Sequence, residues 1–281
     1  MDDTRKAEIM HALSAGIQEL TSSDSWQTWL TCQSRFHTYS FLNTLLIQLQ
    51  APAGTTRVAG FNAWRRLGRN VRKGEKGIAI LAPIVRRTRV EDEDGEQHVI
   101  TGSPSAFRMV YVFADVQTDG EDLPAIAHRL EGDDPNGLYT RLLPVAASIG
   151  FTVEEDYLDA GSNGDCDHRT CRIRIEARND PRQQVKTLAH ELAHAILHGD
   201  SYQGSRELAE LEAESVAFIV CSSLQLDSSE YSFGYLAGWA GGGDEAIAGI
   251  KSAGANIHRA ADHILTQLEG ADMRASGDEA A

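Results

Sequence analysis

The chain lacks the features that mark a membrane protein or a secreted disulfide scaffold. No apolar stretch reaches the roughly 18 to 20 residues that a membrane-spanning helix needs, and only 4 of the 281 residues are cysteines. The opening residues Met1, Asp2 and Asp3 do not form the basic and then apolar run of a secretory signal. We therefore expect a cytoplasmic protein with no membrane partner and with reduced thiols.

Basic residues are scarce overall, but they are unevenly distributed. The 41 acidic side chains outnumber the 26 basic ones and give a formal net charge of -15 at pH 7. Between Arg57 and Arg89, however, 10 basic residues accompany the single acid Glu75, a net of +9 within 33 residues. Residues 1–90 carry +7 and residues 91–281 carry -22. Such asymmetry predicts separate modules, the first of which meets a polyanion.

Composition and periodicity predict an α+β chain of two domains. The first domain is expected over 1–118, with helices over 3–19 and 26–49 followed by strands over 77–83 and 106–113. Along the last of these strands, Phe107, Met109, Tyr111 and Phe113 share one face. Residues 119–137 are rich in Gly, Pro, Asp and Glu and are expected to be a linker.

The second domain is expected over 138–270, followed by a disordered tail over 271–281. Its predicted helices cover 138–149, 181–198, 206–224 and 244–268, and its predicted strands cover 151–157 and 171–177. Asp180-Pro181 predicts a capped start for the helix over 181–198.

The sequence His190-Glu191-Leu192-Ala193-His194 predicts a metal site on this helix. Residues four apart lie on the same helix face, so His190 and His194 can direct ring nitrogens at one ion. Glu191 can act on a water molecule at the ion. The surrounding residues are uncharged, which predicts a buried helix, and buried histidines need partners or a metal. The alternative is a pair of hydrogen-bonded core histidines.

A catalytic zinc usually has three protein ligands and one open position, so we expect a third ligand from the next helix. Glu210 and Glu214 lie four apart there, and Glu212 is expected to point elsewhere. We predict Glu210 as the ligand and Glu214 as the carboxylate that orients a ligand histidine, with the reversed assignment left open. His198 is expected to be a structural neighbour rather than a ligand.

Three further features of the second domain bear on its chemistry. The segment Cys166-Asp167-His168-Arg169-Thr170-Cys171 lacks a second ligand pair and is read as a turn rather than a structural zinc site. The strand over 172–175 alternates polar and apolar residues and could hold an extended peptide by strand addition. Tyr202, Tyr231 and His258 are candidate donors for stabilising an oxyanion.

The first domain combines cations with aromatic rings, as single-stranded nucleic acid requires. Trp64, Phe61, Tyr39 and Phe36 are interleaved with Arg35, Arg65, Arg66 and Arg69, and the +9 segment adds Arg72, Lys73 and Lys76. No zinc-finger, helix-turn-helix or RNP pattern is present, so nothing predicts base-specific reading. The alternative is that some of these aromatic residues belong to the core and that the arginines form a solvated face.

Two stretches resemble known families. Leu188 to His198 with Glu210-Leu211-Glu212-Ala213-Glu214 resembles the zincin metallopeptidases of the ImmA/IrrE-like group and of ArdC-type antirestriction proteins. The resemblance implies zinc ligands at His190, His194 and Glu210, with Glu191 as general base. Tyr39 to Asn43, Val58 to Trp64 and Leu67 to Ile78 resemble the single-stranded-DNA-binding domain of ArdC-type proteins, and Asn43 joins the predicted DNA-binding residues on this match.

The sequence thus predicts a single-stranded-DNA-binding domain followed by a zinc metallopeptidase domain with one Zn2+ per chain. The expected role is antirestriction or regulatory proteolysis on a mobile element, and the protein or peptide substrate is not identified. One alternative is a DNA-binding protection protein whose metal site is structural or vestigial. Another is a peptidase that cleaves a repressor on DNA. The pairing of Glu191 with both histidines favours an active site, because a structural site needs no base.

Overall fold

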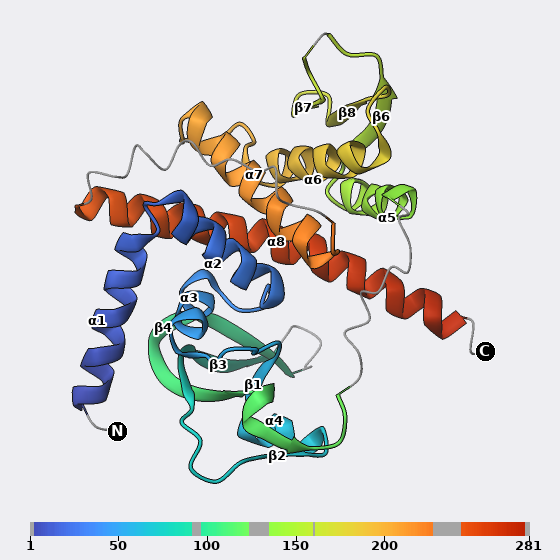
Figure 1. Cartoon of the computed structure of the whole chain (residues 1–281). Coiled ribbons are helices and arrows are strands. Elements are labelled where there is room, and N and C mark those ends of the chain that lie inside the picture. The colour runs from blue at the N-terminus through green and yellow to red at the C-terminus, as the bar shows by residue number, and fades with distance from the viewer. Residues whose placement is uncertain (1–2, 92–96, 124–134, 160, 227–242, 279–281) are drawn as a thin grey trace. The chain divides into compact units, whose positions relative to one another are not determined.

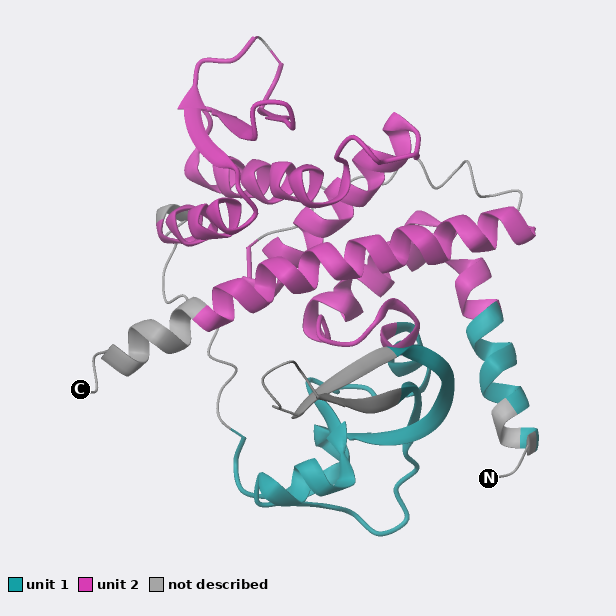
Figure 2. Cartoon of the chain, turned by 180° about the vertical axis from the view of Figure 1, so that it is seen from behind, with its two compact units in different colours: residues 1–14, 45–123 teal, residues 15–44, 124–281 magenta. Residues whose placement is uncertain are grey.

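The structure is a computed structural model that describes residues 3–91, 97–123, 135–159, 161–226 and 243–278. The fold is α+β, as the sequence predicts. Contacts divide the chain into two compact units, which Figure 2 colours separately. Unit 1 consists of residues 1–14 and 45–123, and unit 2 consists of residues 15–44 and 124–281. The predicted first domain therefore contributes an N-terminal segment to unit 2.

The elements follow the predicted order, with the labels of Figure 1, but the helix predicted over 26–49 is two helices, which residues 36–40 separate. The helices are α1 (Asp3–Glu19), α2 (Ser23–Arg35), α3 (Phe41–Gln50), α4 (Phe61–Arg66), α5 (Pro135–Ser148), α6 (Pro181–Leu197), α7 (Arg206–Ser223) and α8 (Asp244–Asp278), with a 3-10 helix at Asp115–Gln117. The strands are β1 (Val58–Gly60), β2 (Arg69–Val71), β3 (Ile78–Glu91), β4 (Gln97–Ala114), β5 (Thr118–Gly120), β6 (Thr152–Asp156), β7 (Gly164–Asp167) and β8 (Arg172–Glu176).

Unit 1 contains an antiparallel sheet with the strand order β1-β4-β3, and a separate pair of strands, β2 and β5. The two faces of the sheet differ, because successive side chains point to opposite sides. Ile78 pairs with Val112, and both are buried. Tyr111 and Phe107 lie on the other face, where they are 41% and 63% exposed. One face therefore forms core, and the other presents aromatic rings to solvent.

In unit 2, helix α2 packs against α7 although the two are far apart in sequence. Trp26 and Trp29 of α2 are fully buried. The indole N–H of Trp26 donates a hydrogen bond of 3.0 Å to Oγ of Ser215 on α7, and the ring of Trp29 meets Phe41 edge-on, with centroids 5.1 Å apart. Unit 2 is therefore built from two separate stretches of chain.

Helix α6 occupies the centre of unit 2. It contacts β7 and β8 as well as α5, α7 and α8, and Figure 1 shows it between the small sheet and α8. That sheet has the order β6-β8-β7, with β6 parallel and β7 antiparallel to β8. Leu188 and Leu192 of α6 and Ile257 and Ile264 of α8 are fully buried. Residues on α6 are consequently held by packing on several sides.

Two features of unit 2 differ from the sequence prediction. Strand β7 was not predicted, because its residues Gly164-Asp165-Cys166-Asp167 have little β propensity and owe their conformation to pairing with β8. Helix α8 continues to Asp278, where a disordered tail was predicted from 271, because this segment contains good helix formers and no proline. Every described helix is too short or too polar to span a bilayer.

Candidate metal centre

Helix α6 begins where its sequence predicts. The side chain of Asp180 accepts hydrogen bonds from the backbone N–H groups of Arg182, at 3.0 Å, and Gln183, at 3.2 Å. Pro181 opens the helix, where its missing N–H has no intrahelical partner to lose. The predicted cap is confirmed, and it sets the register of the helix that carries the histidines.

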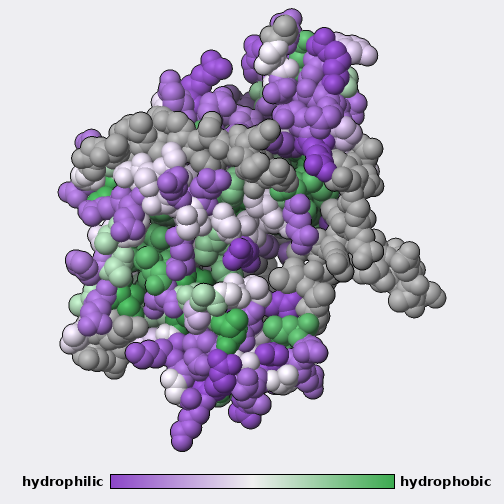
Figure 3. Space-filling model, viewed as in Figure 1, coloured by the Kyte–Doolittle hydropathy of each residue, from purple (hydrophilic) through white to green (hydrophobic). Residues whose placement is uncertain are grey.

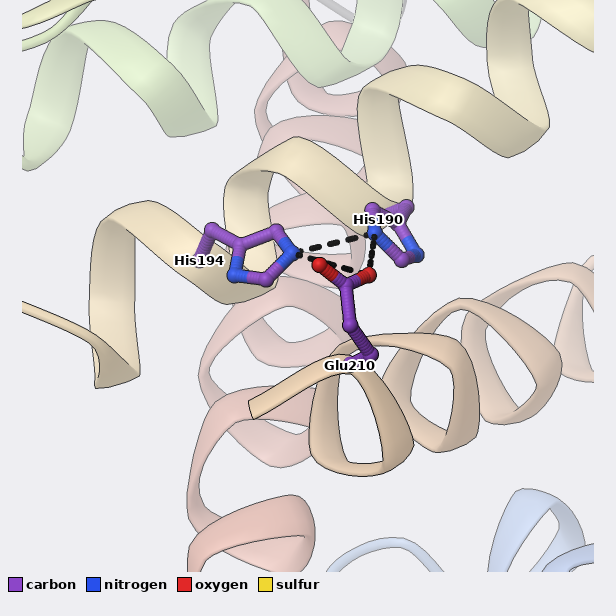
Figure 4. Close-up of side chains that lie close together, drawn as sticks. All are labelled: His190, His194 and Glu210. Carbon is purple, nitrogen blue, oxygen red and sulfur yellow. Dashed lines mark hydrogen bonds and ion pairs between the residues drawn. The ribbon is translucent and has the colours of Figure 1, made fainter. Parts of the chain in front are cut away.

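The histidines of α6 lie opposite a buried side of the helix. Leu188 and Leu192 are fully buried, and His190 and His194, four residues apart, project together toward α7. Figure 4 shows both rings meeting the carboxylate of Glu210, which comes from α7. The predicted ligand triad is therefore brought together by two helices that pack against each other.

The atoms of this triad have the spacing of a ligand set. Nε2 of His190 and Nε2 of His194 are 3.0 Å apart, and Oε2 of Glu210 lies 3.4 Å from the first and 3.7 Å from the second. Ligands at tetrahedral zinc, bound at roughly 2.0 to 2.2 Å, are separated by about 3.4 Å. Among the described residues, this is the one group of three or more His, Cys, Asp or Glu side chains with such spacing.

The hydrogen bond from His190 to Glu214 leaves the Nε2 atom of His190, which faces the other two residues of the triad, as an acceptor. Nδ1 of His190 lies 3.2 Å from Oε2 of Glu214 and donates to it when the ring is neutral. The Nε2 lone pair then points at a second imidazole and at the carboxylate of Glu210. Converging acceptors need a shared cation, which fits a divalent metal ion. Glu214 thus occupies the orienting position that the sequence predicts.

Without a metal, a proton takes the place of that cation. Burial lowers the pKa of His190, but the carboxylates of Glu210 and Glu214 outweigh it and raise this pKa to about 9. Hydrogen bonds from His190 and His194 lower the pKa of Glu210. The site therefore favours positive charge at its centre and an ionised carboxylate at its edge.

Glu191 is buried beside the triad without belonging to it. The residue is 7% exposed, and burial raises the pKa of its carboxyl group, against the opposing effect of His190 and His194. A carboxylate with a raised pKa is suited to take up and return a proton near neutral pH. Strand β7 passes close by, because a Cβ atom at Gly164 would lie 3.1 Å from Cγ of Glu191.

A cleft of about 670 Å³ opens over these residues. Its walls come from α6, from the start of α7, and from residues 161–166 with His168, and the part of unit 2 that holds β6, β7 and β8 has a mainly hydrophilic surface (Figure 3). The strand predicted to hold a peptide, residues 172–175, is β8, which is paired on both sides and cannot add another strand. The edge strand beside the cleft is β7.

Glu212 points away from the triad, as predicted, and does not line the cleft. Its Oε2 lies 2.9 Å from Nε2 of His198, a contact that the sequence did not predict. Nδ1 of His198 lies 2.8 Å from Nδ1 of His194. Helix α7 is buried on more than one face, so Glu210 can complete the triad while Glu212 meets His198, the residue that follows α6. Burial lowers the pKa of His198, which is a neighbour of the site, as predicted, and not a member of the triad.

Two of the three predicted oxyanion donors, Tyr202 and His258, do not lie in the cleft. The hydroxyl of Tyr202 donates to Oε2 of Glu212 at 3.0 Å, and Nδ1 of His258 lies 3.4 Å from Nε2 of Gln33. Neither residue lines the cleft, because the hydrogen bonds of each are made within the core. Tyr231 lies outside the described residues.

The segment from Cys166 to Cys171 comprises the end of β7 and the turn of residues 168–171 that leads into β8, so the prediction of a turn holds for its second part. Burial raises the pKa of Cys166 to about 12, so its thiol is protonated when no metal is bound. His168 instead binds α6, with Nε2 donating to the carbonyl oxygen of His194 at 3.1 Å. The turn thereby braces the helix that carries the triad.

The residues predicted to bind DNA are divided between the units. Arg35, Tyr39 and Asn43 belong to unit 2, and Trp64, Arg65, Arg66, Arg69, Arg72, Lys73 and Lys76 belong to unit 1. In unit 1, Arg65, Arg66, Lys73 and Lys76 are exposed. Arg69 donates to Oγ1 of Thr118 at 2.8 Å, and Arg72 pairs with Glu75 at 2.7 Å. These last two arginines therefore also hold the fold of unit 1.

Trp64 is not a stacking surface, which corrects the sequence prediction. The residue is 1% exposed, and its indole N–H donates to the carbonyl oxygen of Phe113 at 2.9 Å. A buried tryptophan with its N–H satisfied belongs to the core. Because two arginines follow Trp64 in the sequence, we predicted that it lies at the surface, but tertiary packing buries it.

The exposed aromatic residues of unit 1 are instead Phe61, Phe107 and Tyr111. Phe61 meets Phe113 edge-on, with ring centroids 6.3 Å apart. We call Phe61, Phe107, Tyr111 and Phe113 the aromatic face. The alternation along 106–113 placed three of them on one side of a strand, but it could not tell which side is buried.

Comparisons with known proteins agree with this architecture. Residues 3–113 match the family described as the N-terminal domain of anti-restriction factor ArdC. Residues 150–225 match a peptidase family described as the IrrE N-terminal-like domain. An uncharacterized protein of Bacillus anthracis is 24% identical over 280 residues, which cover 84% of this chain and 46% of that protein. The chain thus spans about half the length of this relative.

Two crystal structures share the fold. The metal-free structure of antirestriction ArdC protein from the R388 plasmid has a TM-score of 0.52 and 23% identity, covering 83% of this chain and 86% of that one. The Mn(II)-bound structure of the same protein has a TM-score of 0.55 and 20% identity, covering 91% of this chain and 97% of that one.

Proposed function

We propose that this chain, which joins an ArdC-type N-terminal domain to an IrrE N-terminal-like domain, binds single-stranded DNA and hydrolyses peptide bonds at a zinc site. The observation that carries the peptidase part is the convergence of His190, His194 and Glu210, with the buried carboxyl group of Glu191 beside them. Two imidazoles and one carboxylate are the ligands of several zinc peptidases. Mn(II), which the related ArdC structure contains, is the alternative metal for the same three residues.

His190, His194 and Glu210 would hold the ion, and the remaining position would face the cleft. Bound there, a zinc ion would lower the pKa of water and polarise the scissile carbonyl. Glu214 keeps the ring of His190 oriented through the 3.2 Å contact with its Nδ1. His190, His194 and Glu210 would thus bind the ion, and Glu214 would keep one of these ligands in the orientation that binding needs.

Glu191 supplies the proton transfer. Its carboxylate accepts a proton from the attacking water and returns it to the leaving amine, so the residue ends the cycle as it began. Burial raises its pKa, which makes the carboxylate a stronger base and the acid easier to form. Gly164 lies close to its side chain, because a Cβ atom at this position would come within 3.1 Å of Cγ of Glu191.

The cleft is suited to an extended peptide. Strand β7 forms one wall and is the edge strand of its sheet, so its free side can pair with a substrate backbone. Lys186 and Arg206 also line the cleft, together with the carboxylates of Asp165 and Glu214.

Single-stranded DNA is assigned to unit 1. The aromatic face offers rings for stacking, and Arg65, Arg66, Lys73 and Lys76 add exposed cations in the same unit. Stacking on aromatic rings is tolerant of sequence, and phosphate contacts are sensitive to salt. Antirestriction, the activity named for the related ArdC protein, is the proposed role of the whole chain.

The test compares the unmutated chain with Glu191→Gln and with a His190→Ala, His194→Ala double variant. The purified unmutated chain and Glu191→Gln should each contain about one zinc, and the double variant should contain none. In cells under restriction challenge, only the unmutated chain should protect DNA and change the abundance of specific protein fragments. Equal protection by Glu191→Gln, with no protein differentially cleaved, would refute the peptidase and favour a DNA-binding protection protein with a structural metal site.

A further inference from the structure

Glu212 is a buried carboxylate whose hydrogen bonds are made within unit 2. The residue is 1% exposed. Its Oε2 faces Nε2 of His198 at 2.9 Å and accepts from the hydroxyl of Tyr202 at 3.0 Å, and its Oε1 accepts from Nδ2 of Asn256 at 2.8 Å. A buried polar group needs such partners. Glu212 is therefore a buried acceptor, to which Tyr202 and Asn256 both donate.

These contacts determine where the proton of His198 lies. Oε2 of Glu212 already accepts from Tyr202 and Oε1 accepts from Asn256, so this carboxyl group acts as an acceptor and Nε2 of His198 must carry the hydrogen of the 2.9 Å contact. In the neutral ring, Nδ1 is then an acceptor. Its neighbour at 2.8 Å is Nδ1 of His194, which must be the donor of that hydrogen bond.

The same reasoning determines the state of His194. With its hydrogen on Nδ1, the Nε2 atom of His194 has a free lone pair. This is the atom that lies 3.0 Å from Nε2 of His190 and 3.7 Å from Oε2 of Glu210. The lone pair thus points into the metal site, and the order of donors runs from His194 to His198 to Glu212.

We propose that His198 and Glu212 are positioning residues that keep His194 in its metal-binding tautomer. The inference rests on the metal site of the proposed function and adds two residues to it. His190 has a carboxylate in direct contact, Glu214, whose side chain is 26% exposed. His194 is linked to the carboxylate of Glu212 only through the imidazole of His198, and Glu212 is buried. The two ligand histidines are therefore oriented by different means.

The direct test is the tautomer of each ring. Side-chain ¹H–¹⁵N spectra of the metal-free full chain, labelled at histidine, should show His198 with hydrogen on Nε2 and His194 with hydrogen on Nδ1. Assignment uses His198→Gln and His194→Gln variants, each of which removes one set of signals. A His198 ring with hydrogen on Nδ1, donating toward His194, would overturn the proposal.

Zinc affinity provides a second readout, measured by competition with a chromogenic chelator. His198→Leu removes both hydrogen bonds and should weaken zinc binding by about 10- to 100-fold, the usual effect of removing a group that orients a metal ligand. His198→Gln keeps an amide oxygen to accept from His194 and an amide N–H to donate to Glu212, so it should retain most of the affinity. Glu207→Gln, on an exposed part of α7, is the matched control and should bind zinc as the unmutated chain does.

The outcomes separate this inference from the proposed function. If the unmutated chain binds no zinc, the proposed metal site is wrong, and the tautomers of the metal-free chain still test the positioning role of His198 and Glu212. If the unmutated chain binds zinc, and a His198→Leu variant that circular dichroism shows to be folded binds zinc equally well, only the positioning role is wrong. If His198→Leu does not fold, the tautomer spectra of the unmutated chain decide.

Discussion

Gly164 of β7 approaches Glu191 of α6 so closely that there is no room for a side chain between them. A Cβ atom built at position 164 would lie 3.1 Å from Cγ of Glu191, 2.6 Å from Cγ2 of Thr187 and 3.0 Å from the carbonyl oxygen of Arg174. Contacts this short force neighbouring atoms to move. The edge strand and the proposed base are therefore in direct contact through a glycine.

Gly164→Ala should impair the proposed base while leaving the metal ligands in place. Overpacking of this kind costs about 1 to 3 kcal/mol of folding free energy, and the displaced Glu191 should lower peptidase activity. Zinc content should stay near one per chain, as measured by elemental analysis. Gly199→Ala is the control, because its Cβ would meet its nearest neighbour, His168, at an ordinary 3.7 Å. A Gly164→Ala variant with full activity would contradict the placement of Glu191.

Variants of the two glutamates on α7 should distinguish ligand from orienting group. Glu210→Ala removes a proposed ligand and should weaken zinc binding more than Glu214→Gln, for which about 10- to 100-fold is expected. Co(II) substituted for zinc provides a spectroscopic check, because its visible absorption reports the number of ligands. The reverse order of effects would exchange the two assignments.

The raised pKa of His190 predicts how pH acts on the metal-free chain. This pKa is about 9, above the ordinary value of 6.5, so the protonated ring stabilises the fold fully below pH 6.5 and the effect is lost as pH rises through 9. Metal-free chain should therefore lose up to about 3 kcal/mol over this range, and His190→Gln should lose less. Denaturant unfolding at several pH values measures both. A larger loss in the variant would contradict the origin of the shift.

Zinc binding should release protons for the same reason. Metal binding needs the neutral ring, so near pH 7.5 each zinc that binds should displace about one proton from His190. Isothermal titration calorimetry in two buffers of different ionisation enthalpy measures this number. No proton release at this pH would show that His190 is neutral before zinc binds.

The aromatic face predicts which variants weaken DNA binding. Phe107→Ala and Tyr111→Ala should each reduce affinity for single-stranded DNA by about 1 to 3 kcal/mol, the usual contribution of one base stacked on an aromatic ring. Both side chains are already exposed, so thermal stability should change little. Trp64→Ala should instead destabilise unit 1 by about 3 to 5 kcal/mol. Fluorescence anisotropy with a labelled oligonucleotide, on the full chain, tests these expectations, and unchanged affinity in both surface variants would refute the assignment.

Much of the metal centre follows from signals within one helix. Asp180 and Pro181 specify where α6 starts, and a spacing of four brings His190 and His194 to one side whatever the rest of the chain does. The choice of Glu210 needed only the next helix and its register. Local geometry was sufficient to predict that these residues lie close together, and their role as metal ligands stays a prediction.

Residues whose role depends on distant neighbours were not predictable in this way. Glu212 meets His198 because α7 is buried on more than one face, and a helical pattern identifies a single preferred face. Trp64 is followed by two arginines in sequence, but it is buried and its indole N–H donates to the carbonyl oxygen of Phe113. Strand β7 depends on pairing with β8. In each case the contact that determines the role joins two segments whose pairing no local pattern in the sequence predicts.

The hydrogen bond between Trp26 and Ser215 has a consequence for how such proteins evolve. The core around α7 includes side chains from residues 15–44, so the codons for the metal-binding half are split between two separate stretches of the gene. A recombination event that transferred only the distal codons would leave α7 without its tryptophan neighbours. The two stretches are thus expected to be inherited together, even where the segment between them is exchanged.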